Sequence, residues 1–220
     1  MTSLLIFDCD GVLVDSEVLA VRAEARVLAE VGFPMTEDEI ANSCVGLSYP
    51  DMMALLEERF SKPVPDGLEE RIQEEAIAGF PTELREIAGM GEMLAGSALP
   101  RCVASSGTPE RIALSLGITG LDAYFSSDSI FSSVSVEHGK PAPDLFLHAA
   151  THMGVRPEEC VVVEDSPHGI SAARAAGMTA VALAAGGHIR SSTVDKLRAA
   201  GAHHIVPDVA TLHELLSAEG

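Results

Sequence analysis

Basic residues are scarce in this sequence. Lys and Arg together number 14 against 33 Asp and Glu, which gives a formal net charge of -19 at pH 7. So large a surplus of negative charge repels polyanions at long range, and we therefore expect neither a nucleic acid nor an anionic membrane surface as a partner. A small anionic substrate is not excluded, because a divalent cation and a few local Lys or backbone amide groups can reverse the field inside a cleft.

Long apolar runs, clustered cysteines and linker-like segments are also missing. No stretch approaches the length that spans a membrane, and the first apolar run has no basic region before it. The cysteines form neither a CxxC pair nor a metal-ligand spacing, and all lie in apolar segments: Cys9, Cys44, Cys102 and Cys160. With 47% hydrophobic residues and no low-complexity tract, we expect a globular protein of the reducing cytoplasm, either monomer or homodimer.

Short apolar runs alternate with stretches of helical pattern along the chain. The runs are rich in β-branched residues, as Val161 to Val163 show, and span residues 4–7, 101–105, 160–164, 179–183 and 204–206. Alternation of this kind predicts parallel strands joined by helical crossovers. Strands that are apolar almost throughout are covered on both faces, so the sequence predicts an α/β fold with a doubly wound, Rossmann-like parallel sheet.

The connection between the first two predicted strands is longer than a crossover requires, which is about a dozen residues. Apolar residues recur in it at helical spacing, for example from Val18 to Leu28. We predict that residues 15–81 form a small all-helical cap domain inserted after the first strand, and that residues 1–14 and 82–220 form the core domain. Linkers at both ends of the cap would let it close over a site at the sheet edge.

Acidic residues follow two of the predicted strands. Asp8 and Asp10 come after the first strand, and Glu164 and Asp165 come at the end of the strand that begins at residue 160. Ligands of open parallel sheets bind beyond the carboxyl ends of the strands, where these four carboxylates converge. Close carboxylates repel one another unless a cation neutralises them, and a hard oxygen site suits Mg²⁺. The alternative is that these acids cap helices or turns. It explains a single pair more easily than two pairs that both lie at strand ends.

Small residues follow the second predicted strand. Ser105, Ser106 and Gly107 form a turn, and Thr108 and Pro109 have the pattern of a helix N-cap and first helical residue. Free backbone amides at such a turn bind anions, although an ordinary capped helix has the same pattern.

Lysine is rare enough for each one to be informative. The chain has Lys62, Lys140 and Lys196, and the segment after Lys140 is stiffened by Pro141 and Pro143. An ammonium group fixed near four carboxylates would hold a nucleophile and a substrate oxygen together. A solvated loop lysine is the alternative.

Four short motifs occur in a fixed order along the chain. They are Asp-Cys-Asp-Gly-Val-Leu-Val-Asp-Ser at 8–16, Ser-Ser-Gly at 105–107, Lys-Pro-Ala-Pro-Asp at 140–144 and Val-Glu-Asp-Ser-Pro-His-Gly at 163–169. Together they closely resemble the haloacid dehalogenase-like hydrolase superfamily, in its helical-cap subfamily of β-phosphoglucomutase-like proteins and sugar-phosphate phosphatases. The resemblance spans nearly the whole chain.

The resemblance implies a role for each matching residue. Asp8 would be the nucleophile that attacks phosphorus, and Asp10 the general acid and base. Ser105 would bind the phosphate with its hydroxyl, beside the Ser106 amide and Gly107, and Lys140 would orient nucleophile and phosphoryl group. The Mg²⁺ ligands would be Asp8, the backbone carbonyl of Asp10, Glu164 and Asp165. The implied activity is a Mg²⁺-dependent phosphatase that forms an aspartyl-phosphate intermediate.

The branch of the family follows from residues that the sequence does or does not contain. Asp10 argues against haloalkanoate dehalogenases, which lack it, and the segment 45–49 lacks the lysine of phosphonatases. β-Phosphoglucomutases are the main alternative, but Ala20 and Tyr49 stand where that group has a His and an Arg. We therefore expect a phosphatase for sugar, sugar-acid or polyol phosphates.

Other residues carry weaker predictions. Glu17, Tyr49 and Arg59 are candidates for substrate contact, although each fits packing or surface equally well. No His has metal spacing with a carboxylate partner, so we expect weak effects on turnover from changing any of the following: His138, His168, His188, His203 and His204. A non-catalytic binding protein on this fold is the alternative to an enzyme. The intact set of clustered charges disfavours it.

Overall fold

A parallel sheet forms the centre of the molecule. The computed structural model describes residues 2–44, 47 and 49–219. Its six-stranded sheet has the order β3-β2-β1-β4-β5-β6, and every pair is parallel. The strands are β1 Leu4–Phe7, β2 Arg101–Ser105, β3 Ile130–Ser132, β4 Cys160–Glu164, β5 Thr179–Leu183 and β6 His204–Val206. The predicted α/β fold and the five predicted strands are confirmed, whereas the edge strand β3 is not predicted from the sequence.

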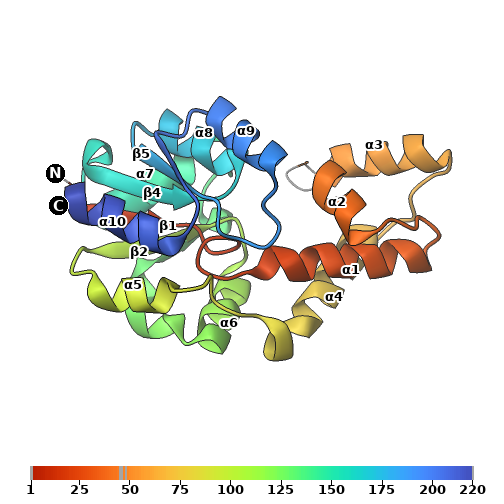
Figure 1. Cartoon of the computed structure of the whole chain (residues 1–220), viewed down its shortest axis with the longest axis horizontal. Coiled ribbons are helices and arrows are strands. Elements are labelled where there is room, and N and C mark those ends of the chain that lie inside the picture. The colour runs from red at the N-terminus through yellow and green to blue at the C-terminus, as the bar shows by residue number, and fades with distance from the viewer. Residues whose placement is uncertain (1, 45–46, 48, 220) are drawn as a thin grey trace.

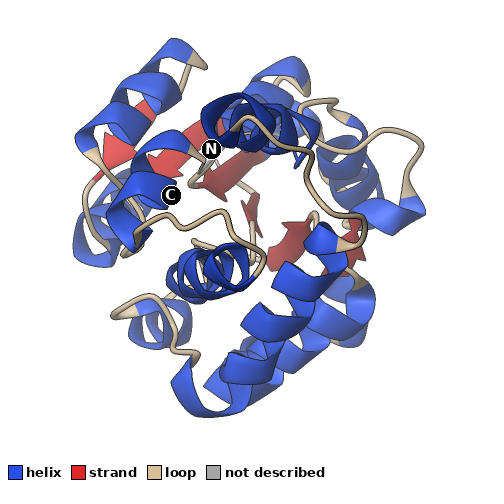
Figure 2. Ribbon diagram, turned by 90° about the vertical axis from the view of Figure 1, so that its right-hand side faces the viewer, coloured by secondary structure: helices blue, strands red, loops and turns tan. Residues whose placement is uncertain are grey.

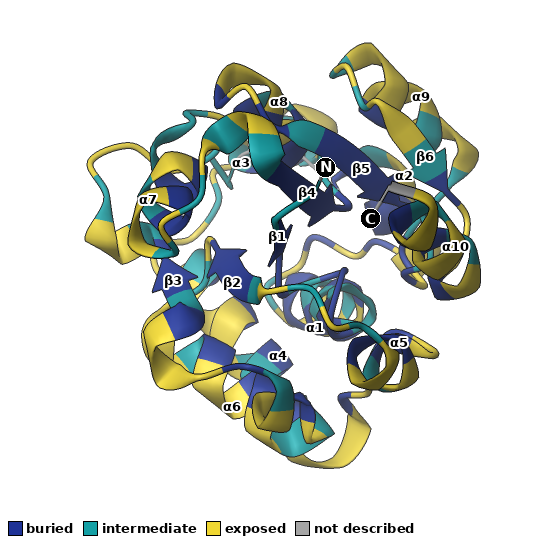
Figure 3. Ribbon diagram, turned by 90° about the vertical axis from the view of Figure 1, so that its left-hand side faces the viewer, coloured by how far each residue is buried: buried dark blue, intermediate teal, exposed yellow. Residues whose placement is uncertain are grey.

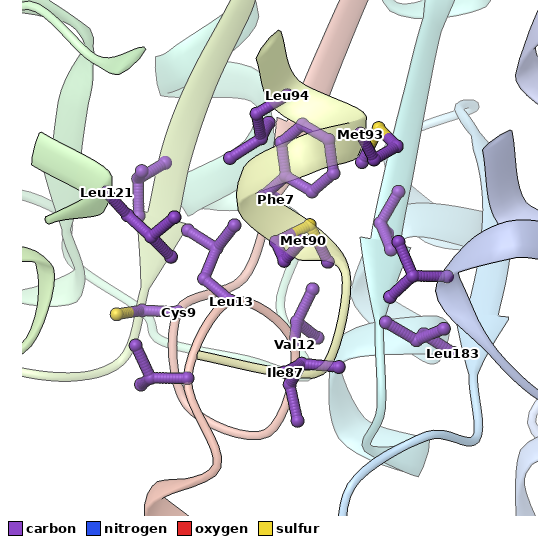
Figure 4. Packing of buried hydrophobic residues seen from close by; sticks show 14 of the residues in the cluster. Phe7, Cys9, Val12, Leu13, Ile87, Met90, Met93, Leu94, Leu121 and Leu183 are labelled. Atoms are coloured by element: carbon purple, nitrogen blue, oxygen red, sulfur yellow. The ribbon is translucent and has the colours of Figure 1, made fainter. Parts of the chain in front are cut away.

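Helices cover both faces of this sheet (Figure 2). Successive residues of a strand point to opposite faces, so Leu5 and Phe7 pack on one side and Leu4 and Ile6 on the other. The first side is covered by α5 Met90–Gly96, α6 Pro109–Thr119 and α10 Val209–Glu219; the second by α7 Asp144–His152, α8 Pro167–Ala175 and α9 Ser191–Ala199. Figure 4 shows the first side, where Phe7 meets Met90, Met93 and Leu94 of α5. Burial from both sides explains why the strands are apolar throughout (Figure 3).

Four consecutive helices follow β1 along the chain, before α5 and β2. They are α1 Ser16–Glu30, α2 Glu37–Ser43, α3 Tyr49–Phe60 and α4 Leu68–Glu83, and they lie together at the right of Figure 1, away from both termini. We call residues 16–83 the helical segment. It buries an apolar cluster of its own, with Leu28, Phe33 and Leu56 fully enclosed. None of the helices in the described ranges is both long and apolar enough to cross a membrane.

The two ends of the helical segment meet at the sheet. The backbone N–H of Asp15 donates to the carbonyl of Arg85 at 2.9 Å, and that of Ile87 to the carbonyl of Leu13 at 2.9 Å. Helix α4 continues through Pro81 to Glu83, so the predicted boundary between residues 81 and 82 falls in its last turn. Pro81 has no N–H to donate to the carbonyl of Ile77, so the helix lacks one hydrogen bond close to its end. The division into core and cap domains stays a prediction.

Candidate active site

Three neighbouring strands bring the predicted site residues to one edge of the sheet. Phe7 of β1 pairs with Val103 of β2 and Val163 of β4, so the residues that follow these positions emerge side by side. They line a cavity of about 340 Å³, a size that suits a small metabolite. The predicted residues in its wall are Asp8, Asp10, Glu17, Ser105, Ser106, Gly107, Lys140, Glu164 and Asp165.

Lys140 lies at the centre of the charged groups. Its Nζ donates hydrogen bonds to Asp8 Oδ1 and to Glu164 Oε1, both at 2.7 Å, and to the carbonyl of Ala104 at 3.1 Å. Burial alone would lower the pKa of Lys140, but the carboxylates of Asp8 and Glu164 raise it above its ordinary value. The side chain therefore remains a fixed cation between β1, β2 and β4, and the alternative of a solvated loop lysine is wrong.

Three carboxylates form a cluster around this single ammonium. Oxygens of Asp8, Glu164 and Asp165 all lie within 4.8 Å of one another. Burial, and then the charges of Glu164 and Asp165, raise the pKa of Asp8 well above its ordinary value, while Lys140 acts in the opposite direction. One ammonium does not balance three buried carboxylates. The donor set therefore fits a divalent cation that prefers oxygen, and Asp10 would add only its backbone carbonyl.

Glu164 is held in place by the start of α8. Its Oε2 accepts hydrogen bonds from the N–H of Asp165 at 2.9 Å, the N–H of Ser166 at 2.8 Å and the Ser166 hydroxyl at 2.9 Å. The Ser166 hydroxyl also accepts from the N–H of Gly169 at 3.0 Å, which makes it the N-cap of α8. A Cβ at Gly169 would lie 1.8 Å from Glu164 Oε1, so any larger residue there would displace the Glu164 carboxylate.

Asp10 is held by one residue of the helical segment and one of the core helices. Its Oδ1 accepts from the hydroxyl of Ser16, the first residue of α1, at 2.6 Å and from Arg111 Nη2 on α6 at 3.1 Å. The Arg111 guanidinium also lies over the ring of Phe80, 5.7 Å from its centroid. The candidate acid and base is thus fixed from both sides of the cavity.

The turn after β2 is fixed from the edge strand β3. The hydroxyl of Ser132 donates to the carbonyl of Gly107 at 2.6 Å, and that of Ser133 donates to the carbonyl of Ser106 at 3.0 Å. The N–H of Gly107 donates to Ser105 Oγ at 3.2 Å, and Ser105 is buried. The carbonyl groups of Ser106 and Gly107 are therefore bound by the last residue of β3 and the residue after it.

Comparison with known proteins agrees with this geometry. The family model of haloacid dehalogenase-like hydrolases matches residues 5–183. The chain belongs to this family. Among its relatives, 6-phosphogluconate phosphatase of Escherichia coli is 32% identical over 79% of each chain. The phosphorylated carbohydrates phosphatase of Thermotoga maritima is 35% identical over 79% of this chain and 81% of its own. A haloacid dehalogenase-like protein of Agrobacterium tumefaciens has a similar structure, with a TM-score of 0.93 and 34% identity over 100% and 99% of the two chains.

The three candidates for substrate contact in this haloacid dehalogenase-like hydrolase do not all line the cavity. Glu17 lines the cavity, and burial, with a smaller contribution from the Asp165 carboxylate, raises its pKa to about 7. Tyr49 and Arg59 are not among the described residues of the cavity wall, and Arg59 forms an exposed ion pair with Glu39. Of the loop 45–49, positions 45, 46 and 48 lie outside the described residues.

Two turns further along α1, Glu24 is a half-buried acid whose Oε2 has no partner among the described residues. Burial, and then Glu17, raise its pKa to about 7. A folded-state pKa above the unfolded value of 4.5 means that stability present below pH 4.5 is lost as the pH rises through 7. Glu24→Gln cannot ionise, so we expect its free energy of unfolding to exceed that of wild type by on the order of 1–3 kcal/mol at pH 8.

Urea unfolding between pH 5 and 8 measures this difference. It should grow with pH for Glu24→Gln, and Glu58→Gln, a change at an exposed residue of α3, is the matched control. A gain for Glu24→Gln that is the same at every pH would contradict the assignment of the shift to this carboxyl group.

Arg111 and His188 line the cavity and contact Asp10 and Asp165, but neither was among the predicted site residues. Arg111 is the third residue of α6, so the predicted N-cap at Thr108 already places it in the first turn, facing the strand ends. His188 follows β5 in a Gly-Gly-His sequence and is buried against Asp165, with 3.1 Å between Nε2 and Oδ2. The rule that ligands bind after the ends of parallel strands, applied to β5 as well, would have pointed to His188.

Proposed function

We propose that this hydrolase is a Mg²⁺-dependent phosphatase of small phosphorylated sugars, sugar acids or polyols. The observation that carries the proposal is the Lys140 ammonium, held between Asp8 and Glu164 in the wall of the cavity. A carboxylate attacks a phosphate dianion poorly unless nearby positive charge offsets the repulsion. A fixed, buried lysine at the candidate nucleophile supplies part of that charge.

In the first step of the proposed reaction, an oxygen of Asp8 attacks phosphorus while the ester bond to the leaving oxygen breaks. Asp10 gives that oxygen a proton, so that the product leaves as an alcohol. The Ser105 hydroxyl, the amides of the following turn and Lys140 hold the phosphoryl oxygens. The result is a phosphoryl group bound covalently to Asp8 and a carboxylate at Asp10.

The second step releases phosphate. Asp10, now ionised, accepts a proton from a water molecule that attacks phosphorus, and the bond to Asp8 breaks. Both carboxyl groups return to their starting states. Two displacements with lower barriers thereby replace one slow hydrolysis.

Asp8, Glu164 and Asp165 are the side chains that would hold Mg²⁺, together with the Asp10 carbonyl. When bound, the cation neutralises negative charge on the transferring phosphoryl oxygens. Glu164 already uses both oxygens in hydrogen bonds, so Asp8 and Asp165 have more capacity left for the metal.

We assign the helical segment the role of a cap that closes over the cavity and selects the substrate. Its two residues nearest the chemistry are Ser16, bonded to Asp10, and Glu17, whose pKa of about 7 lets it donate or accept a hydrogen bond to a substrate hydroxyl. The relatives named for 6-phosphogluconate and phosphorylated carbohydrates support a polyhydroxylated substrate. The four buried, free cysteines fit action in the reducing cytoplasm.

A phosphate-detection assay with Mg²⁺ tests the proposal and separates it from a mutase. We expect phosphate release from at least one of 6-phosphogluconate, fructose 1-phosphate and glucitol 6-phosphate, and loss of that release with chelator. Hexose 1-phosphates should give free phosphate as well, because Ala20 on α1 replaces the mutase His. Isomerisation of β-glucose 1-phosphate without phosphate release would favour the mutase, and no turnover of any ester would favour a binding protein.

A further inference from the structure

The loop between β5 and α9, residues 184–190, contributes one side chain to the carboxylate cluster. His188 is only 4% exposed, and it is the residue of this loop that lines the cavity. Its Nε2 lies 3.1 Å from Asp165 Oδ2, and the two side chains are 3% and 7% exposed. A buried imidazole that contacts a single carboxylate at this distance donates its N–H to it.

Glycines on both sides make room for this contact. A Cβ at Gly11 would lie 1.8 Å from Asp165 Oδ2 and 3.2 Å from His188 Cε1. A Cβ at Gly186 would lie 2.7 Å from both Cε1 and Nδ1 of His188. The imidazole and the carboxylate are therefore packed closely against two glycine backbone segments, which leave room for their contact.

The same loop is attached to the start of α1. The N–H of Gly187 donates to Asp15 Oδ1 at 3.1 Å, and a Cβ at Gly187 would lie 2.6 Å from a Val18 methyl group. Arg190 Nη1 donates to the Gly187 carbonyl at 2.9 Å. The position of His188 is thus fixed by the loop, independently of Asp165.

We propose that His188 is a positioning residue for Asp165, which it holds by one oxygen so that the other faces the cation. The inference rests on the cation site of the proposed function and concerns a residue from which the sequence predicts only weak effects. Carboxylates that bind metals are commonly oriented by hydrogen bonds from a second residue. Loss of such a partner weakens metal binding by about 10–100-fold, because the carboxylate ligand is no longer held in one orientation.

Binding of Mg²⁺ to the full chain without substrate tests the proposal, by isothermal titration calorimetry. His188→Leu fills a similar volume without a donor, and His188→Gln can place its amide N–H near the Nε2 position. We expect the Kd for Mg²⁺ to rise about 10–100-fold in His188→Leu and to return most of the way in His188→Gln. At saturating Mg²⁺ the kcat of both variants should fall far less than the affinity.

His213→Gln, a change at an exposed histidine of α10, is the matched control and should keep the wild-type Kd. If His188→Leu does not fold, His188→Asn replaces it, because its shorter amide does not reach the Nε2 position. A Kd for the variant without a donor equal to that of wild type would overturn the proposal, as would equal losses in the Leu and Gln variants. A wild type that binds no Mg²⁺ would overturn both this inference and the proposed cation. A wild type that binds Mg²⁺ and hydrolyses no ester would contradict only the proposed phosphatase.

Discussion

Asp8→Asn should release no phosphate, with kcat lower by about 10⁴-fold or more. The amide is a poor nucleophile and forms no acyl phosphate, so the first displacement fails whatever the substrate. Stability should change in the opposite direction. Because burial raises the pKa of Asp8 well above its ordinary value, the ionised carboxylate is unfavourable in the folded state at neutral pH. A neutral side chain of the same shape removes that cost, so the metal-free variant should unfold at the wild-type temperature or above it.

Single-turnover phosphate detection and thermal unfolding in chelator measure the two effects on the same sample. Asp128→Asn, a change at an exposed aspartate, is the control and should alter neither. Residual turnover above one per cent of wild type would show that Asp8 is not the nucleophile. A large fall in the unfolding temperature would show that its charge is needed to balance Lys140.

Lys140→Met should lower both activity and stability. The substitution keeps most of the apolar stem and removes the ammonium that donates to Asp8, Glu164 and the Ala104 carbonyl. Three buried carboxylates then lie close together without the ammonium. Removal of one partner from a buried ion pair costs about 3–5 kcal/mol of stability. We expect kcat to fall by about 10³-fold, because the nucleophile loses its orientation and the phosphoryl oxygens lose a positive partner.

Chemical denaturation in chelator and steady-state kinetics in Mg²⁺ test this expectation. Lys62→Met is the control, because Lys62 is half-buried and donates to the Gly32 carbonyl within the helical segment rather than at the carboxylate cluster. The double variant Asp8→Asn with Lys140→Met should recover part of the lost stability, since it has one carboxylate fewer to balance. Equal stability of Lys140→Met and wild type would mean that the carboxylates are protonated in the metal-free protein.

The sheet could be predicted from the sequence because its strands are buried on both faces. Runs such as residues 160–164 have no other structure available that would bury so many β-branched residues at once. β3 was missed for the opposite reason. Only Ile130, Phe131 and Ser132 form it, serines surround it, and an edge strand of three residues leaves almost no periodic pattern.

The positions of the candidate site residues were predictable because strand ends collect polar residues at known places in this fold. Asp8, Glu164 and Lys140 meet in the structure as the motifs indicated. Arg111 and His188 were missed because one comes from a helix surface and the other from a glycine-rich loop. Their roles depend on distances between segments far apart in the chain, which spacing along the sequence does not encode.

The hydrogen bonds from Asp15 to Arg85 and from Ile87 to Leu13 affect how this chain can evolve. They close the base of the helical segment, so the chain leaves the sheet and returns to it at nearly one point. A segment attached in this way can be lengthened, shortened or exchanged as a unit while the register of β1 and β2 is kept. Under the proposed function, selection on the choice of metabolite can therefore act on residues 16–83 while the residues at the strand ends are inherited unchanged.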